Sequence, residues 1–261
     1  MLLCIDIGNT HVHYGVVAHG QALFQRELPT RAIDHPSEGF GPVIERLTAE
    51  YPDLEGAAFC SVVPAAAKLL VRLFELQKFA QPLFQLTADK RLGVPLNYPK
   101  PWEIGQDRLA DTAGAQAFCG APVIVIGLGT AVTFDIITRA HGYEGGIIAP
   151  GLDVMRRYLH EQTALLPLLD DSLDVPRAIG KSTVEAMRIG TVIGMGGMIQ
   201  ALLTAVLAEL ASRGEPLPRV LATGGTALLI EKTLPPSATV VPDLTLRGLA
   251  AAWRLNPPVQ P

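Results

Sequence analysis

The feature that most constrains this chain is an internal repeat that occurs once in each half of its 261 residues. Residues 4–10 read CIDIGNT, an apolar run that leads into an acidic residue and a glycine turn. Residues 125–131 read VIGLGTA with the same layout, except that Gly127 stands where Asp6 stands in the first copy. Each copy predicts a strand–turn–strand hairpin. Two such hairpins in two half-chains indicate an α/β protein with two similar domains that face each other across a cleft.

Hydrophobic periodicity places further strands and helices around the two hairpins. Strands are expected over residues 2–5, 13–17, 56–63, 122–126, 131–137 and 219–222, and helices over 36–51, 65–78, 106–119, 183–213 and 246–253. The domain boundary is expected within residues 114–122. This gives an N-terminal domain over 1–117 with the first glycine turn, and a C-terminal domain over 118–261 with the second turn and a Gly-Gly turn.

Composition and charge exclude several classes of protein. Apolar residues make up 49% and charged residues 18% of the chain, which predicts a sizeable core. A formal charge of -4 with scattered Lys and Arg argues against nucleic-acid binding and against a polybasic membrane anchor. The N-terminus lacks the basic region of a signal peptide, and the apolar stretch 186–210 carries polar residues and reads as a buried helix. The sparse cysteines Cys4, Cys60 and Cys119 favour core positions in a cytoplasmic protein.

The first glycine turn, residues Asp6, Ile7, Gly8, Asn9 and Thr10, has the chemistry of a phosphate-binding loop. Glycine lets backbone amides approach a phosphate closely, and Asn9 and Thr10 add side-chain donors. Asp6 at the strand end could hold Mg²⁺ through water, because Mg²⁺ prefers hydrated oxygen sites. An ordinary hairpin turn is the alternative, since Gly-Asn is common turn chemistry. The repeat favours the phosphate-binding interpretation.

The second glycine turn spans residues 127–135 and supplies the hydroxyls of Thr130 and Thr133 beside flexible backbone. A glycine-rich strand connection is the alternative. A third candidate is the Gly-Gly pair at 224–225, which follows an expected strand and suits the close approach of a nucleotide, although Gly-Gly is also a plain turn.

An acid and a base stand side by side at an expected helix start, in residues 105–108. Asp107 could accept a proton from a hydroxyl nucleophile, and Arg108 could clamp an anion. The alternative is a helix-start Asp stabilised by the macrodipole, with a solvated Arg beside it.

In their order along the chain, these motifs resemble type III pantothenate kinases, and the resemblance covers nearly the whole sequence. Further matches are the SVVP run at 61–64, Tyr98, GGIIAPG at 145–151, GKST at 180–183 and DLTLRGL at 243–249. Each motif is weak alone, but the ordered set is specific. The resemblance implies the actin/hexokinase/Hsp70 (ASKHA) fold and ATP-dependent phosphorylation of pantothenate to 4'-phosphopantothenate, the first step of coenzyme A biosynthesis.

The resemblance also implies site residues, cofactors and an assembly. The positions that match ATP contacts are Asp6, Ile7, Gly8, Asn9, Thr10, His11, Val12, His13 and Thr130. Those that match pantothenate contacts are Tyr98, Gly105, Gln106, Asp107, Arg108 and Thr183, with Asp107 as the general base. Mg²⁺, a monovalent cation (K⁺ or NH₄⁺) and a homodimer complete the set.

One departure from the family pattern concerns the monovalent cation. In the family an Asp normally precedes the second Gly-Thr turn and binds that cation, whereas this chain has Gly127. The stretch 152–157 also departs from the pattern. Two interpretations therefore stay open: an active kinase, favoured by the intact segment 105–108, and a catalytically weak homologue with an accessory or regulatory ligand-binding role, favoured by Gly127.

Overall fold

A computed structural model describes residues 1–227, 231 and 234–257. The chain divides into two compact units, unit 1 (residues 1–120 and 243–261) and unit 2 (residues 121–242). Each unit contains one β-sheet with helices packed on it, so the predicted α/β class is confirmed. That the two units face each other across a cleft stays a prediction.

Unit 1 is built on a sheet of strand order β3-β2-β1-β5-β6, with β4 paired to β2. Its strands are β1 (Leu2–Ile7), β2 (His11–Ala18), β3 (Gln21–Ala22), β4 (Arg26–Pro29), β5 (Gly56–Ser61) and β6 (Leu83–Gln85). Its helices are η1 (Thr30–Ala32), α1 (Phe40–Glu50), α2 (Pro64–Leu76), η2 (Pro101–Glu103), α3 (Gln106–Cys119) and α6 (Leu244–Leu255).

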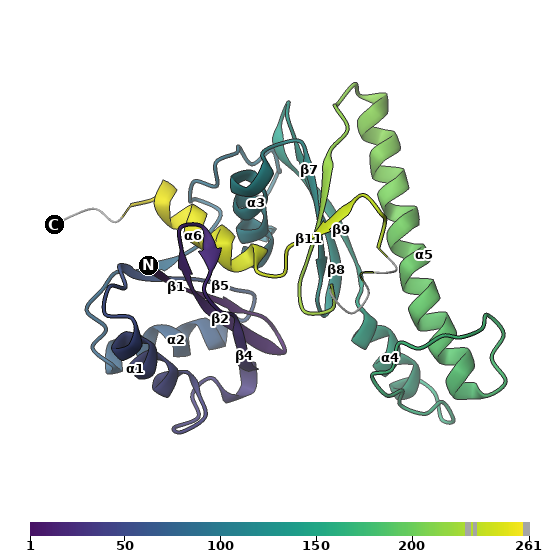
Figure 1. Cartoon of the computed structure of the whole chain (residues 1–261), viewed down its shortest axis with the longest axis horizontal. Helices are drawn as coiled ribbons and strands as arrows, with labels where there is room; N and C mark the ends of the chain where they lie inside the picture. Colours follow the sequence, from purple (N-terminus) through teal and green to yellow (C-terminus); the bar gives the residue numbers. More distant parts are fainter. Residues whose placement is uncertain (228–230, 232–233, 258–261) are drawn as a thin grey trace. The chain divides into compact units, whose positions relative to one another are not determined.

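Successive side chains of strand β1 point to opposite faces of the sheet. Leu3, Ile5 and Ile7 belong to the core cluster that α1 and α2 cover. Cys4 and Asp6 therefore point to the opposite face, the one against which α6 packs (Figure 1). The acidic residue of the first turn thus reaches the helical layer of α3 and α6 rather than the main core.

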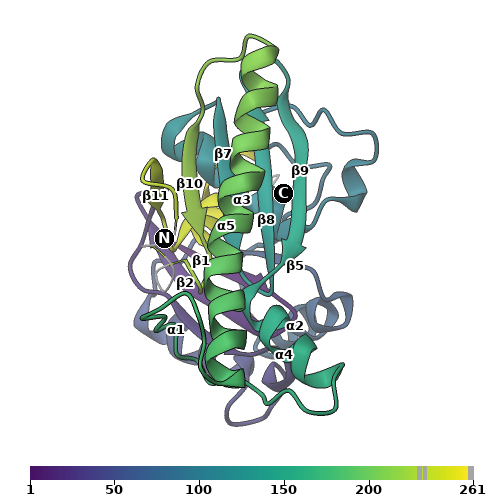
Figure 2. The same ribbon diagram turned by 90° about the vertical axis from the view of Figure 1, so that its right-hand side faces the viewer.

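Unit 2 has a sheet of strand order β11-β10-β7-β8-β9, and its described residues include the helices α4 and α5. Its elements are β7 (Val123–Leu128), β8 (Ala131–Thr138), β9 (Gly142–Pro150), α4 (Leu152–Glu161), α5 (Thr183–Ser212), β10 (Arg219–Thr223) and β11 (Ala238–Val240). Helix α5 runs along this sheet (Figure 2) and buries Met195, Ile199 and Leu203 against apolar residues of β7 and β8.

The two sheets repeat one topology, which confirms the predicted internal repeat. In each, the first strand of a hairpin pairs antiparallel with its successor and parallel with a later strand, β1 with β2 and β5, and β7 with β8 and β10. Asp6 and Gly127 are both the fifth residue of a six-residue strand, and both are half-buried in an otherwise buried segment. The repeat is therefore structural as well as sequential.

Helix α6 differs from the expected domain division, which placed it in a C-terminal domain over 118–261. It belongs to unit 1, where it packs most extensively against α3. The two helices cross closely at Gly114 and Gly248: a Cβ on Gly248 would overlap the Ala110 carbonyl oxygen. Leu246 and Leu249 of α6 are buried by this packing.

Helix α5 also differs from expectation, because the sequence indicated a buried helix. By length and composition alone it could cross a membrane, and only 28% of its most apolar 18-residue window is buried. A Cβ built on Gly190, Gly194 or Gly197 would meet no atom within 4 Å. One face of α5 is thus apolar and uncovered within the described part of the chain.

Candidate functional site

Two carboxylates of unit 1 lie close enough to influence each other. Asp6 is the last residue but one of β1, and Asp107 lies in the first turn of α3. Burial, and to a smaller extent the charge of Asp107, raise the pKa of Asp6 to about 7 against the opposing effect of a hydrogen bond from Cys60. A nearly neutral pKa means that this carboxylate can change its charge near physiological pH. Perturbed carboxylates of this kind cluster at functional sites.

Asp107 is held at the helix start by its own backbone neighbourhood. The Arg108 amide donates to Asp107 Oδ1 at 2.8 Å. Burial is the main cause that raises the pKa of Asp107, and the Arg108 amide and charge act against it. A carboxylate whose pKa is raised toward neutrality is a better proton acceptor for a hydroxyl than an ordinary Asp.

The preceding residue, Gln106, fastens the start of α3 to the end of β5. Its Oε1 atom accepts a hydrogen bond from the Ser61 amide at 3.0 Å and one from Gln85 Nε2 at 3.3 Å. The sequence assigned Gln106 to substrate contact. In the structure its side-chain oxygen accepts hydrogen bonds from two protein groups. These hydrogen bonds fix the position of the adjacent Asp107.

Cys60 is a site residue that the sequence interpretation missed. Its Sγ atom donates to Asp6 Oδ1 at 3.3 Å, and the two residues are direct neighbours in the parallel β1–β5 register. Burial raises the pKa of the Cys60 thiol well above its usual value, so the thiol keeps its proton. The signal was available in outline, since two parallel strands that end at the same level bring Asp6 and Cys60 together.

The first glycine turn is held by a hydrogen bond within the turn and by another from Thr30. The Gly8 amide donates to the His11 carbonyl at 3.0 Å, and Thr30 Oγ1 donates to the Gly8 carbonyl at 2.7 Å. Asn9 and Thr10 at the tip are exposed. A rigid turn with exposed donors suits the predicted phosphate contact.

His13 lies on the other side of Asp6 in the sheet. The two residues pair in the β1–β2 register, and His13 Nδ1 lies 3.3 Å from Glu27 Oε2 on β4. Burial is the main cause that lowers the pKa of His13. Across unit 1, one row of the sheet therefore carries Glu27, His13, Asp6 and Cys60 in order.

In unit 2 the second glycine turn and the Gly-Gly turn meet. The Gly129 amide donates to the Ala131 carbonyl at 3.1 Å, and the Thr226 amide donates to the Leu128 carbonyl at 3.1 Å. Gly224 has a φ of 98°, and a Cβ there would press on the same Leu128 carbonyl. The two turns proposed from sequence as nucleotide contacts are thus neighbours in the structure.

Gly127 lies between two threonines at the end of this sheet. It pairs with Thr133 on β8 and with Thr223 on β10. The Thr223 hydroxyl oxygen is buried and, among the described residues, has no hydrogen-bond partner. The surroundings of Gly127 offer hydroxyls, and there is no carboxylate at its position. They therefore do not fit a monovalent-cation site built around the Asp that the family pattern has there.

The remaining predicted substrate residues fall in both units. Thr183, the first residue of α5, lines a cavity of about 830 Å³ in unit 2 whose walls come mostly from apolar side chains of α4 and α5. Tyr98 is half-buried in the irregular segment before η2 of unit 1. The structure brings Gln106 and Asp107 together with Asp6, and it does not test the contacts assigned to Tyr98 and Thr183.

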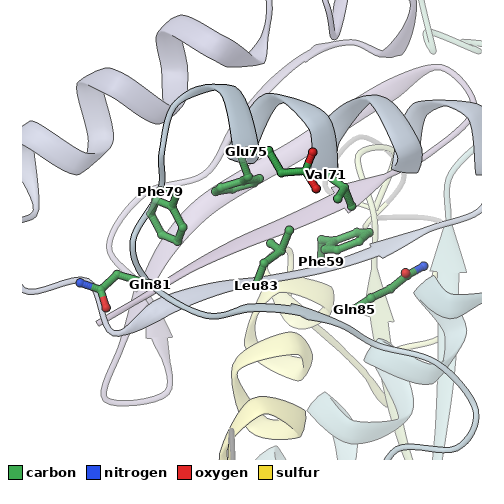
Figure 3. Close-up of a pocket in the computed structure, with 8 residues that line it drawn as sticks. Phe59, Val71, Glu75, Phe79, Gln81, Leu83 and Gln85 are labelled. Carbon is green, nitrogen blue, oxygen red and sulfur yellow. The ribbon is translucent and has the colours of Figure 1, made fainter. Parts of the chain in front are cut away.

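A second cavity in unit 1, of about 390 Å³, lies apart from the carboxylates. Figure 3 shows it beside α2 and strands β5 and β6, where Val71, Phe79 and Leu83 form its walls. Phe59 lines it from β5 and belongs to the core cluster under α1 and α2. Cys60 follows Phe59 and points to the other face, so the cavity does not reach the Asp6 carboxylate from β5. Gln85, which donates to Gln106 Oε1, also lines the cavity and connects it to the start of α3.

No group of three or more His, Cys, Asp or Glu side chains within residues 1–227 and 234–257 is placed to hold a metal ion. Mg²⁺ in phosphoryl-transfer sites needs only one or two carboxylates, because water and substrate phosphates supply its other ligands. The half-buried Asp6 beside a glycine turn fits that mode of binding.

Comparison with known proteins identifies the relatives of this chain. A family model described as type III pantothenate kinase matches residues 2–205. A type III pantothenate kinase of Akkermansia muciniphila is 42% identical over 255 residues, which cover 97% of this chain and 98% of its own length.

Two solved structures are similar in fold. One is a Campylobacter jejuni protein assigned to the Baf family of transcriptional activators, with a TM-score of 0.59 and 18% identity over 98% of each chain. The other is the activator of the 2-hydroxyisocaproyl-CoA dehydratase of Clostridium difficile with bound ADPNP, with a TM-score of 0.50 and 13% identity over 97% of this chain and 94% of that one. At these identities the likeness shows the fold alone, and it confirms the predicted ASKHA type.

Proposed function

Because this chain belongs to the type III pantothenate kinase family, we propose that it transfers a phosphoryl group from ATP to the primary hydroxyl of pantothenate, with Asp107 as the general base. The observation that carries the assignment of the base is the half-buried carboxylate of Asp107 at the start of α3, whose pKa is raised mainly by desolvation. Phosphoryl transfer depends on positioning and charge stabilisation more than on covalent chemistry by the protein.

The carboxylate of Asp107 receives the hydroxyl proton as the oxygen of pantothenate attacks the terminal phosphate. Its position is set from two sides, by the Arg108 amide and by the Gln106–Ser61 hydrogen bond. A base fixed in this way loses little entropy when substrate binds, which supports its assignment.

Pantothenate carries a carboxylate, and we assign its recognition to Arg108, with Tyr98, Gly105 and Thr183 as further contacts. A guanidinium binds a carboxylate through two parallel hydrogen bonds, which fixes orientation as well as affinity. Arg108 directly follows the base in the chain, which supports this role. A substrate whose carboxylate is bound by Arg108 can present its hydroxyl near Asp107.

ATP contacts are assigned to the first glycine turn, residues 6–13, and to Thr130 in the second turn. Mg²⁺ supplies charge neutralisation on the phosphates when it is bound, and Asp6 would hold it through water. The braced turn at Gly8 and the exposed side chains of Asn9 and Thr10 support phosphate contact.

A monovalent cation is not assigned to this chain. Gly127 offers only backbone oxygen, and its neighbours Thr133 and Thr223 offer hydroxyls. Without the carboxylate that anchors the cation elsewhere in the family, we infer that the chain works without K⁺ or NH₄⁺ stimulation.

A homodimer is assigned through the uncovered face of α5. Val184 and Ile193 are 37% and 51% exposed on this helix, and its glycines leave open space for another helix to approach. We infer that a second copy covers this face, because the helix also carries, at other positions, the charged residues Glu185, Arg188 and Glu209, which a bilayer would disfavour. Sedimentation equilibrium should give a dimer, and association with detergent micelles instead would point to a membrane.

The cytoplasm is the assigned compartment, supported by Cys4 and Cys60, which are buried in the core as thiols. The accessory role considered from Gly127 gains no support from the relatives, whose family name is that of the kinase.

An ATP-consumption assay of the pure protein tests the proposal. ADP should form with pantothenate and Mg²⁺ present, and mass spectrometry should detect 4'-phosphopantothenate. ATP binding without any pantothenate-dependent turnover would overturn the kinase assignment and leave the accessory role.

A further inference from the structure

Consecutive residues at the end of β5 contact Asp6 and Gln106, the residue before Asp107. Cys60 Sγ donates to Asp6 Oδ1 at 3.3 Å, and the Ser61 amide donates to Gln106 Oε1 at 3.0 Å, directly beside Asp107. Residues 60 and 61 therefore connect the end of β1 to the start of α3. The spacing between Asp6 and Asp107 is set by this strand end rather than by any direct bond between the two acids.

We infer that Cys60 is a positioning residue for the metal–phosphate site, whose thiol hydrogen bond keeps the Asp6 carboxylate in the orientation that a hydrated Mg²⁺ on ATP requires. The inference rests on the proposed role of Asp6. Cys60 does not touch substrate in this role, because it is fully buried beneath Asp6.

The need for such a donor follows from the surroundings of Asp6. The carboxylate is half-buried and lies near a second acid, so both desolvation and repulsion act on it. A side chain that is repelled from Asp107 turns away unless something holds it. A buried donor at 3.3 Å supplies that restraint, and a thiol does so without adding a charge that would compete for phosphate.

Unit 2 contains the same arrangement without the acid. Thr223 occupies on β10 the place that Cys60 occupies on β5, since each pairs in parallel with the fifth residue of the central strand. In unit 1 that fifth residue is Asp6, and the donor is engaged. In unit 2 it is Gly127, and the Thr223 hydroxyl is left without a partner among the described residues. The comparison indicates that the donor's function in this topology is to hold a carboxylate.

The test compares variants of Cys60 with a matched variant of Cys4. Cys60→Ala and Cys60→Val remove the donor, the second while filling the space, and Cys60→Ser restores a donor. Cys4 is also fully buried and lies on the same face of β1 as Asp6. Its thiol makes only a weak hydrogen bond, to the Leu2 carbonyl at 3.9 Å. Cys4→Ala therefore reproduces the loss of a buried thiol without touching Asp6.

Calorimetry measures ATP affinity with Mg²⁺ and with EDTA, and steady-state kinetics measures Mg²⁺ half-saturation separately from kcat. Cys60→Ala and Cys60→Val should each weaken Mg²⁺-dependent ATP binding by about tenfold, the effect of one hydrogen bond to a charged group. ATP affinity in EDTA should change little. Cys60→Ser should restore Mg²⁺ dependence to within about twofold, and Cys4→Ala should leave it unchanged.

The Asp6→Asn variant separates the two ways in which the experiment can fail. If Asp6→Asn abolishes the Mg²⁺ dependence of ATP binding but the donor-free Cys60 variants keep it, only the role of Cys60 is wrong. If Asp6→Asn itself keeps the Mg²⁺ dependence, the proposed role of Asp6 is wrong and the inference falls with it. Equal losses with Mg²⁺ and with EDTA would reduce Cys60 to a structural residue.

Discussion

Thr223 pairs with Gly127 across strands β10 and β7, and the buried hydroxyl of Thr223 has no hydrogen-bond partner among the described residues. The relation is the same as that of Cys60 to Asp6 in unit 1, where the donor is engaged. An unpartnered buried hydroxyl costs stability, about 1–3 kcal/mol by mutational data. The absence of a carboxylate at Gly127 thus leaves the neighbouring Thr223 hydroxyl without a partner among the described residues.

The first prediction concerns K⁺. Initial rates of the unmodified chain should respond weakly or not at all to KCl, and Gly127→Asp should restore stimulation. Gly127 lies within β7 without a positive φ, so an Asp fits its backbone. The Thr223 hydroxyl should hold the new carboxylate, so Gly127→Asp combined with Thr223→Val should respond less than Gly127→Asp alone.

A sodium series at matched ionic strength is the control for the K⁺ experiment. Strong K⁺ activation of the unmodified chain would contradict the prediction and would indicate a substitute ligand.

The second prediction concerns the base. Asp107→Asn should lower kcat by about 10²–10⁴-fold, because proton transfer by a positioned side chain contributes that much. ATP affinity should stay within about twofold, since the assigned role is toward the hydroxyl of pantothenate. The exposed Glu103→Gln, nearby and paired only with Lys100 at the surface, is the matched control. Near-normal turnover of Asp107→Asn would remove Asp107 from the role.

The third prediction concerns Arg108. Arg108→Ala should raise the KM for pantothenate by about tenfold or more and change the KM for ATP little, because a lost bidentate contact to a carboxylate acts on one substrate only. Calorimetry with each ligand alone is the direct measurement. Loss of ATP affinity with unchanged pantothenate affinity would show that the two sites are assigned the wrong way round.

The fourth prediction concerns Asp6 and pH. Its pKa is about 7 in the folded chain against a usual 3.8, so the fold favours the protonated form. Stability from this group is present below about pH 4 and is lost as the pH rises through about 7. Asp6→Asn, which never ionises, should be about 2–4 kcal/mol more stable than the unmodified chain at about pH 8 and nearly equal at about pH 4.

Urea unfolding at the two pH values measures this difference, with the exposed Asp53→Asn as the control for amide substitution. A variant of Asp6 that is less stable than the unmodified chain at about pH 8 would contradict the prediction. The same substitution should remove activity. The ionised Asp6 that function requires would then lower the stability of the fold.

Much of the fold could be predicted because its signals are local. Helix α3 occupies 106–119 as expected, since Gly120 with a φ of 72° ends it, and both hairpins follow from apolar runs around glycine turns. Strand β9 and helix α4 were not expected. Gly145 and Gly146 interrupt the apolar pattern of β9, and its strand character comes from pairing with β8.

The candidate site could be predicted where chemistry is visible in the residue type, as at Asp6 and Asp107. It could not be predicted where the role depends on register. Cys60 and Thr223 look like core residues in sequence, and only the parallel pairing of β5 with β1 and of β10 with β7 places each beside the fifth strand residue. Such pairings join residues far apart in the chain, which periodicity does not encode.

Helix α6 has a consequence for how the protein is made. It follows unit 2 in the chain, yet it covers the face of unit 1 that bears Cys4 and Asp6. During translation, residues 121–242 leave the ribosome as one continuous unit and can fold, while unit 1 waits with that sheet face bare. The covering of unit 1 by α6 therefore has to wait until unit 2 has been made. An incomplete nascent chain can already join Asp6 to Cys60 and Gln106 to Ser61, but it leaves the sheet face beside them uncovered.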